Sequence, residues 1–99
     1  MGMSKGAIAK KYLLDGRVQG VGCRAQIHSI VISNFSDLSG SVRNLGDGRV
    51  EVCLKGEVAR VTEMEAILRA GLRSPVRVTA VAVENLGDDY APKGFKILG

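Results

Sequence analysis

The chain has 99 residues, of which 45% are apolar and 24% are charged, and its formal net charge at pH 7 is +4. This balance predicts one globular domain and excludes a disordered or low-complexity protein. Two cysteines and one histidine are too few for a disulfide scaffold or a zinc centre. We expect residues 1–6 to be disordered and residues 7–99 to form the domain.

Two kinds of partner are not expected from the composition. No apolar run approaches the ~20 residues that span a membrane, and the N-terminus lacks the apolar core of a signal peptide, so we expect a cytoplasmic protein that does not bind a membrane. The basic residues are spread along the chain, and only Lys10 and Lys11 are adjacent. Without a dense basic arm, no nucleic acid partner is expected.

The first part of the chain predicts a strand, a glycine-rich loop and a helix. Residues 12–14 form a short apolar run that ends at Asp15-Gly16, which is typical of a strand followed by a turn. Residues 16–22 are the predicted loop. From Arg24 onward, apolar residues recur at helical spacing, so a helix is expected from the end of the loop to about residues 34–36.

Two extended segments follow, with the composition of a hairpin. Residues 39–44 and 48–55 are joined through Gly46-Asp47-Gly48, which favours a tight turn. In the second segment, alternation puts Val50, Val52 and Leu54 on one face and Arg49, Glu51, Cys53 and Lys55 on the other. The second face, with Cys53, is expected to be exposed to solvent.

A second helix and two more strands complete the chain. The helix is predicted over about residues 57–71, where apolar residues recur every three to four positions. A strand is expected over residues 76–86, with either a β-bulge or two partly apolar faces, because the apolar positions change phase between Val78 and Val81. A brief closing strand is expected over residues 95–98.

The order of these elements predicts the fold class. The series βαββαβ, followed by one short strand, is the split-βαβ pattern of the ferredoxin-like fold. This is an α+β sandwich in which an antiparallel sheet carries two helices on one face.

The segment GRVQGVGCR, residues 16–24, has the properties of an anion-binding loop. Its glycines permit positive φ, so that consecutive backbone N–H groups can converge on one ligand. The helix that follows adds free N–H groups and the positive end of its dipole, and the Arg24 guanidinium suits two phosphate oxygens. Composition alone leaves open a flexible connection with an incidental surface arginine. The predicted ligand contacts are Gly16, Val18, Gln19, Gly20, Val21, Gly22, Cys23 and Arg24.

The same segment closely resembles the acylphosphatase signature G-x-V-Q-G-V-x-F-R. A second segment, GSVRNLGDGRVEV at residues 40–52, resembles that family's G-W-V-R-N motif followed by a D-G hairpin and V-E-V, and Phe95-x-Ile97 resembles its last strand. Three departures stand out: Cys23 takes the place of the usual phenylalanine, Ser41 that of the usual aromatic residue, and the interval from Arg24 to Asn44 is two residues longer.

The resemblance implies an enzyme that hydrolyses a small acyl phosphate to a carboxylate and inorganic phosphate, without metal, cofactor or covalent intermediate. It implies two catalytic residues: Arg24, which would hold the phosphoryl group, and Asn44, which would orient the attacking water. Phosphate or sulfate ions are expected to bind the same loop, and the protein is expected to be a monomer. The alternative within this fold is a non-catalytic domain that binds acyl or carbamoyl phosphate.

Other reactive side chains favour structural roles. Cys23 at a helix N-terminus is a candidate nucleophile, but its position resembles one that packs a phenylalanine, so we expect a buried thiol that does not pair with Cys53. His28, one helical turn after Arg24, is expected to be a surface histidine. The pair Asp88-Asp89 lacks the further ligands of a calcium or magnesium site. An RNA recognition motif shares the fold but needs strand aromatics, whereas the strand here reads GRVEVCLKG.

Overall fold

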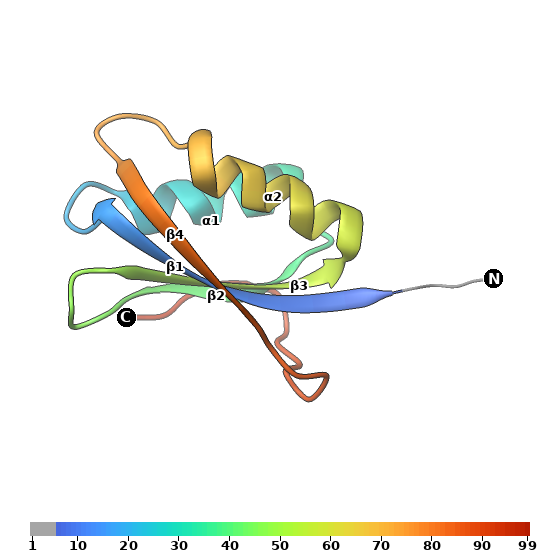
Figure 1. The fold of residues 1–99 in the computed structure, drawn as a ribbon. Coiled ribbons are helices and arrows are strands. Elements are labelled where there is room, and N and C mark those ends of the chain that lie inside the picture. Colours follow the sequence, from blue (N-terminus) through green and yellow to red (C-terminus); the bar gives the residue numbers. More distant parts are fainter. Residues whose placement is uncertain (1–5) are drawn as a thin grey trace.

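A five-stranded sheet carries both helices on one face (Figure 1). The computed structural model describes residues 6–99, and the expectation of a disordered N-terminus therefore lies, for residues 1–5, outside the described part of the chain. The elements are β1 (Ala7–Arg17), α1 (Cys23–Asn34), β2 (Ser39–Asn44), β3 (Val50–Glu57), α2 (Val58–Ala70), β4 (Arg77–Asn85) and β5 (Phe95–Ile97). Within residues 6–99, no helix has the length and apolar character to span a membrane.

The strand order β4-β1-β3-β2-β5 confirms the ferredoxin-like α+β sandwich. Strand β1 lies antiparallel between β3 and β4, and β2 is antiparallel to β3. The expectation of a fully antiparallel sheet was wrong at one edge, because β5 pairs parallel with β2. The chain reaches that edge by passing beneath the sheet, on the side away from the helices, before β5 begins (Figure 1).

The core lies between the helices and the sheet. Apolar side chains at helical spacing on α1 and α2 meet alternate residues of the central strands, as the periodicity predicts. The fully buried members include Tyr12 and Leu14 of β1, Ile27 and Val31 of α1, Val52 and Leu54 of β3, and Val61, Met64 and Leu68 of α2. This packing holds the N-terminus of α1 over the sheet.

Of the two alternatives expected for β4, the structure shows the bulge. Asp15 pairs with Ala80 while the next residue, Gly16, pairs with Val78, so Thr79 has no partner on β1. The extra residue shifts the alternation, and both Val78 and Val81 pack against the core.

The prediction that Cys53 is exposed was wrong. Cys53 does lie on the sheet face away from the helices, but its side chain is only 7% exposed. The segment after β4 covers this face: the Lys55 ammonium donates a hydrogen bond to the carbonyl of Tyr90, and the Tyr90 side chain interacts with those of Cys53 and Ser41. Alternation identifies the face of a residue but not what a distant loop places over it.

Candidate active site

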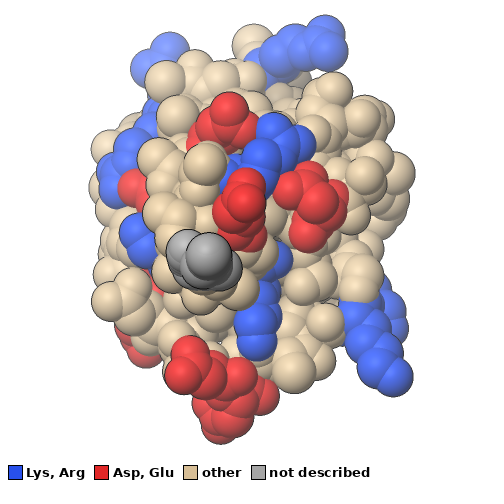
Figure 2. Space-filling model, turned by 90° about the vertical axis from the view of Figure 1, so that its right-hand side faces the viewer, with Lys and Arg blue, Asp and Glu red and all other residues tan. Residues whose placement is uncertain are grey.

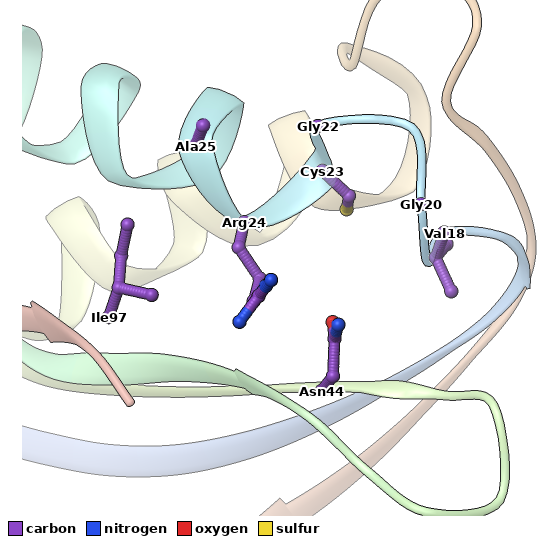
Figure 3. A pocket seen from close by; sticks show the side chains of 8 residues that line it. All are labelled: Val18, Gly20, Gly22, Cys23, Arg24, Ala25, Asn44 and Ile97. Atoms are coloured by element: carbon purple, nitrogen blue, oxygen red, sulfur yellow. The ribbon is translucent and has the colours of Figure 1, made fainter. Parts of the chain in front are cut away.

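A cavity of about 230 Å³ lies where α1 begins above the end of β2 (Figure 3). It is smaller than the roughly 300–1,000 Å³ of pockets that take drug-sized ligands, so it suits a small molecule. The lining residues come from the β1–α1 loop, the first turn of α1 and the last residues of β2 and β5: Val18, Gly20, Gly22, Cys23, Arg24, Ala25, Asn44 and Ile97.

Backbone conformation makes the loop a potential anion site. Gly20 and Gly22 have φ values of 76° and 81°, in the left-handed region, although a Cβ at either position would meet nothing within 4 Å. Glycine is therefore favoured here by conformation and not by crowding. Gly22 is the N-cap of α1, and among the described residues no side chain caps this helix and no acidic residue lies in its first turn. The N–H groups of that turn are left for a ligand.

The two predicted catalytic side chains line the same cavity and point into the space between α1 and β2 (Figure 3). Within residues 6–99, no ion pair or hydrogen bond involves the guanidinium of Arg24. The Oδ1 atom of Asn44 is buried and has no hydrogen-bond partner in the same part of the chain. An unpaired buried acceptor costs about 1–3 kcal/mol, and a water molecule in the cavity would relieve this cost by donating to it.

The two additional residues between Arg24 and Asn44 do not separate them. Helix α1 continues to Asn34, and Phe35 packs into the core before β2 begins. Both side chains still reach one cavity.

Gln19 holds the site together from outside the cavity. Its Nε2 donates to the carbonyl oxygens of Leu45 at 2.7 Å and Arg49 at 2.9 Å. The N–H of Leu45 also donates to the Arg49 carbonyl, at 2.8 Å, so these groups close the β2–β3 hairpin. Because Leu45 directly follows Asn44, Gln19 links the glycine-rich loop to the strand end that carries Asn44.

Two other predicted ligand contacts also lie outside the cavity lining. Gly16 belongs to β1, with φ 126°, and a Cβ there would come within 2.2 Å of the Arg77 carbonyl oxygen. Glycine is required at position 16 because β4 approaches so closely. Val21 is partly buried and packs against the core. The cavity brings together the remaining predicted contacts: Val18, Gly20, Gly22, Cys23 and Arg24.

Two lining residues, Ala25 and Ile97, were not anticipated from the sequence. Ala25 follows Arg24 in the first turn of α1. Ile97 lies more than 50 residues from Asn44 in the chain, and only the pairing of β5 with β2 brings it to the site. No local pattern around Ile97 carries this information.

Neither Cys23 nor His28 is suited to catalysis. Cys23 is 1% exposed, and burial raises the pKa of its thiol to about 11, so the thiol is protonated at neutral pH and is a poor nucleophile. The ring of His28 packs against Phe95, with centroids 6.1 Å apart, and does not line the cavity. Within residues 6–99, no group of three or more histidine, cysteine or acidic side chains is arranged to hold a metal ion.

The fold and the cavity define a small ferredoxin-like domain with a glycine-rich loop beside a cavity. The acylphosphatase family model matches residues 10–97. An acylphosphatase of Koribacter versatilis is 38% identical over 90 residues, covering 91% of this chain and 79% of its own, and one of Rhodopseudomonas palustris is 39% identical over 94 residues, covering 90% and 92%. The crystal structure of acylphosphatase from Bacillus subtilis is similar with a TM-score of 0.83 and 26% identity, covering 93% of this chain and 99% of that one. The chain belongs to the acylphosphatase family.

Proposed function

We propose that the chain hydrolyses acyl phosphates to a carboxylate and inorganic phosphate, by attack of a water molecule positioned by Asn44 on a phosphoryl group held by Arg24. Membership of the acylphosphatase family supports the reaction. The observation that supports the two roles is that a guanidinium and a buried amide oxygen, both without a partner within residues 6–99, line one small cavity.

The phosphoryl group binds at the N-terminus of α1. The free N–H groups of the first turn and the positive end of the helix dipole favour an anion there. The Arg24 guanidinium adds two parallel donors, which match two phosphoryl oxygens and stabilise the charge on them in the transition state.

The attacking water binds to Asn44. Its Oδ1 accepts a hydrogen bond from the water, which turns an oxygen lone pair toward phosphorus and satisfies the buried amide oxygen. Gln19, through the hairpin carbonyls, keeps Asn44 at the distance from the loop that this geometry requires.

The proposed reaction needs neither a metal ion nor a covalent intermediate. The leaving group is a carboxylate, whose conjugate acid has a pKa of about 4, so no strong general acid is required. Phosphoryl transfer depends chiefly on positioning and charge stabilisation, and an amide, a guanidinium and backbone N–H groups supply both.

Two alanine substitutions should fail in different ways. In Arg24→Ala, binding of inorganic phosphate should weaken and turnover of benzoyl phosphate should be lost, because the guanidinium holds charge in the ground and transition states. In Asn44→Ala, phosphate binding should persist while kcat falls by ~100-fold or more, because only the water loses its partner. Steady-state phosphate release measures kcat, and isothermal titration calorimetry measures phosphate binding.

Arg17→Ala is the matched control. Arg17 is an exposed arginine at the end of β1 that does not line the cavity, and its variant should retain kcat within ~2-fold. Circular dichroism must first show that all variants are folded. Parental turnover by folded Asn44→Ala refutes its proposed role, and phosphate binding by the parent without hydrolysis of benzoyl phosphate favours the non-catalytic alternative.

A further inference from the structure

We propose that the acyl group of the substrate lies against Ile97, so that the enzyme prefers apolar acyl groups over acyl groups that carry a second negative charge. This inference rests on the proposed function, because it takes the cavity as the substrate site. It concerns the part of the substrate that Arg24 and Asn44 do not contact.

Ile97 is placed at the site by strand pairing. It is the last residue of β5 and pairs with Val42 of β2, two residues before Asn44. Its side chain remains 44% exposed, although it lines the cavity. A large apolar side chain that is exposed at a binding site gains stability when a ligand covers it.

The cavity has two ends. Val18 and the two glycines line the end at the loop, whereas Ile97 lines the other, and in Figure 3 Arg24 lies between Ile97 and Asn44. In phosphoryl transfer the attacking and leaving oxygens lie roughly in line, on opposite sides of phosphorus. With water at Asn44, the leaving carboxylate and its acyl substituent point away from Asn44, toward the end lined by Ile97.

The charges of the residues that line the cavity determine which acyl groups are preferred. Apart from Arg24, the lining residues are uncharged, and the residue at the acyl end is isoleucine. The phosphoryl group already pairs with the Arg24 guanidinium. A second anionic group at Ile97 would find no further charged partner in the lining, whereas an apolar group would bury apolar surface.

The inference is tested by binding of two phosphonates that cannot be hydrolysed, phenacylphosphonate and acetonylphosphonate, which differ in carrying a phenyl or a methyl group. By isothermal titration calorimetry, the parent should bind the phenyl compound about five- to tenfold more tightly. In Ile97→Ala this preference should fall to about twofold or less. In parallel, Ile97→Ala should lower kcat/KM for benzoyl phosphate about fivefold but change that for acetyl phosphate by less than about twofold.

Leu98→Ala is the matched control. Leu98 is also 44% exposed, is the next residue in the chain, and does not line the cavity. This variant loses a similar apolar side chain and should retain the parental preference. Ile97→Lys provides a second test, because it should shift the ratio of kcat/KM at least tenfold toward succinyl phosphate, which carries a distal carboxylate, over benzoyl phosphate.

The outcomes separate this inference from the proposed function. Equal affinities of the parent for the two phosphonates, or equal losses of preference in Ile97→Ala and Leu98→Ala, would overturn the acyl site at Ile97 even if the parent is a good enzyme. A parent that binds the phenyl compound more tightly but releases no phosphate from either acyl phosphate retains the acyl site and refutes the proposed function.

Discussion

Arg24 and Arg49 lie at the same end of the molecule, but in the described part of the chain only Arg49 of the two is paired with a carboxylate. Arg49 is bound to Asp47 at 2.7 Å, and the hydrogen bond from its side chain is the main cause that lowers the pKa of the Asp47 carboxyl. Arg43, Arg60 and Arg69 likewise pair with carboxylates. Arg24 has no such partner within residues 6–99, which leaves its charge available to a ligand at the N-terminus of α1.

Replacing Gln19 should impair catalysis because Asn44 is then no longer held in position. In Gln19→Leu, two hairpin carbonyls lose their side-chain donor, so we expect the free energy of unfolding to fall by about 1–3 kcal/mol. Asn44 loses its fixed distance from the loop, and kcat should fall ~10-fold while inhibition by phosphate changes by less than ~2-fold. Urea unfolding and steady-state kinetics measure these effects.

Gln26→Leu is the control for the change of side chain. Gln26 bonds to the backbone of Arg73 in the α2–β4 loop and does not line the cavity. Gln26→Leu should keep kcat within ~2-fold of the parental value. If a folded Gln19→Leu protein turns over as fast as the parent, Gln19 does not position Asn44.

Burial of Cys23 should make the protein less stable in alkali. The pKa of its thiol is about 11 in the folded chain, raised by burial from an ordinary value near 9. Below pH 9 both the folded and unfolded chains keep the thiol proton, so the contribution of Cys23 to the free energy of unfolding is fully present. As the pH rises from about 9 to 11, the unfolded chain releases a proton that the folded chain retains, so roughly 2–3 kcal/mol of stability is lost.

Cys23→Ala should flatten this dependence. Urea unfolding between pH 8 and 11 should show a shallower loss for the variant than for the parent, with Cys53 present in both. Parallel stability curves would show that the Cys23 thiol ionises normally. Because the two cysteines lie on opposite faces of the sheet, titration after denaturation should also find two free thiols in the parent.

At the scale of elements, the central strands approach so closely in places that only glycine fits. Gly40 in β2 has φ 146°, and a Cβ there would come within 1.8 Å of the Cys53 carbonyl oxygen on β3. The position lies four residues before Asn44 on the same strand. The glycine therefore allows β2 to pair closely with β3 and to carry Asn44 to the cavity.

Gly40→Ala should destabilise the fold severely. The substituent meets backbone, which cannot move aside, and the φ value disfavours any side chain, so we expect a loss of about 3 kcal/mol or more in the free energy of unfolding. The control is Gly46→Ala in the β2–β3 turn, where φ is not in the left-handed region and a Cβ would meet nothing within 4 Å. It should cost less than ~0.5 kcal/mol by urea unfolding, and equal losses would contradict the account of β2.

For the whole molecule, both edges of the sheet are poorly suited to pairing with another chain. β5 has only three residues, and β4 is interrupted by the bulge at Thr79 and carries the charged residues Arg77 and Glu84. Short, bulged or charged edge strands disfavour association through the sheet. On the face drawn in Figure 2, basic and acidic side chains are interspersed, which favours solubility over self-association.

We therefore predict a monomer in solution. Light scattering coupled to size-exclusion chromatography at micromolar concentration should give the mass of a single chain. A mass of two chains that persists on dilution would show that one of these edges, or another surface, forms a stable interface.

Local information in the sequence was enough for the elements and the family. Periodicity predicted both helices, because side chains recur every 3.6 residues in helices, and the change of phase in β4 left a bulge as one of two alternatives. The turn composition at residues 46–48 predicted the hairpin. The segments at 16–24 and 40–52 indicated the acylphosphatase family, which the comparisons confirm. The loop and Asn44 were predicted as one site, and the structure places Arg24 and Asn44 on one cavity.

Contacts between segments distant in the chain determined the features that local patterns did not predict. Gln19 resembles a ligand contact within its own segment, yet its partners lie 26 and 30 residues away. Ile97 reaches the cavity only because β5 pairs parallel with β2, and Cys53 is buried only because the segment containing Tyr90 folds over it. Alternation and helical spacing specify which face a residue occupies, whereas what covers that face depends on packing between segments distant in the chain, which no local pattern encodes.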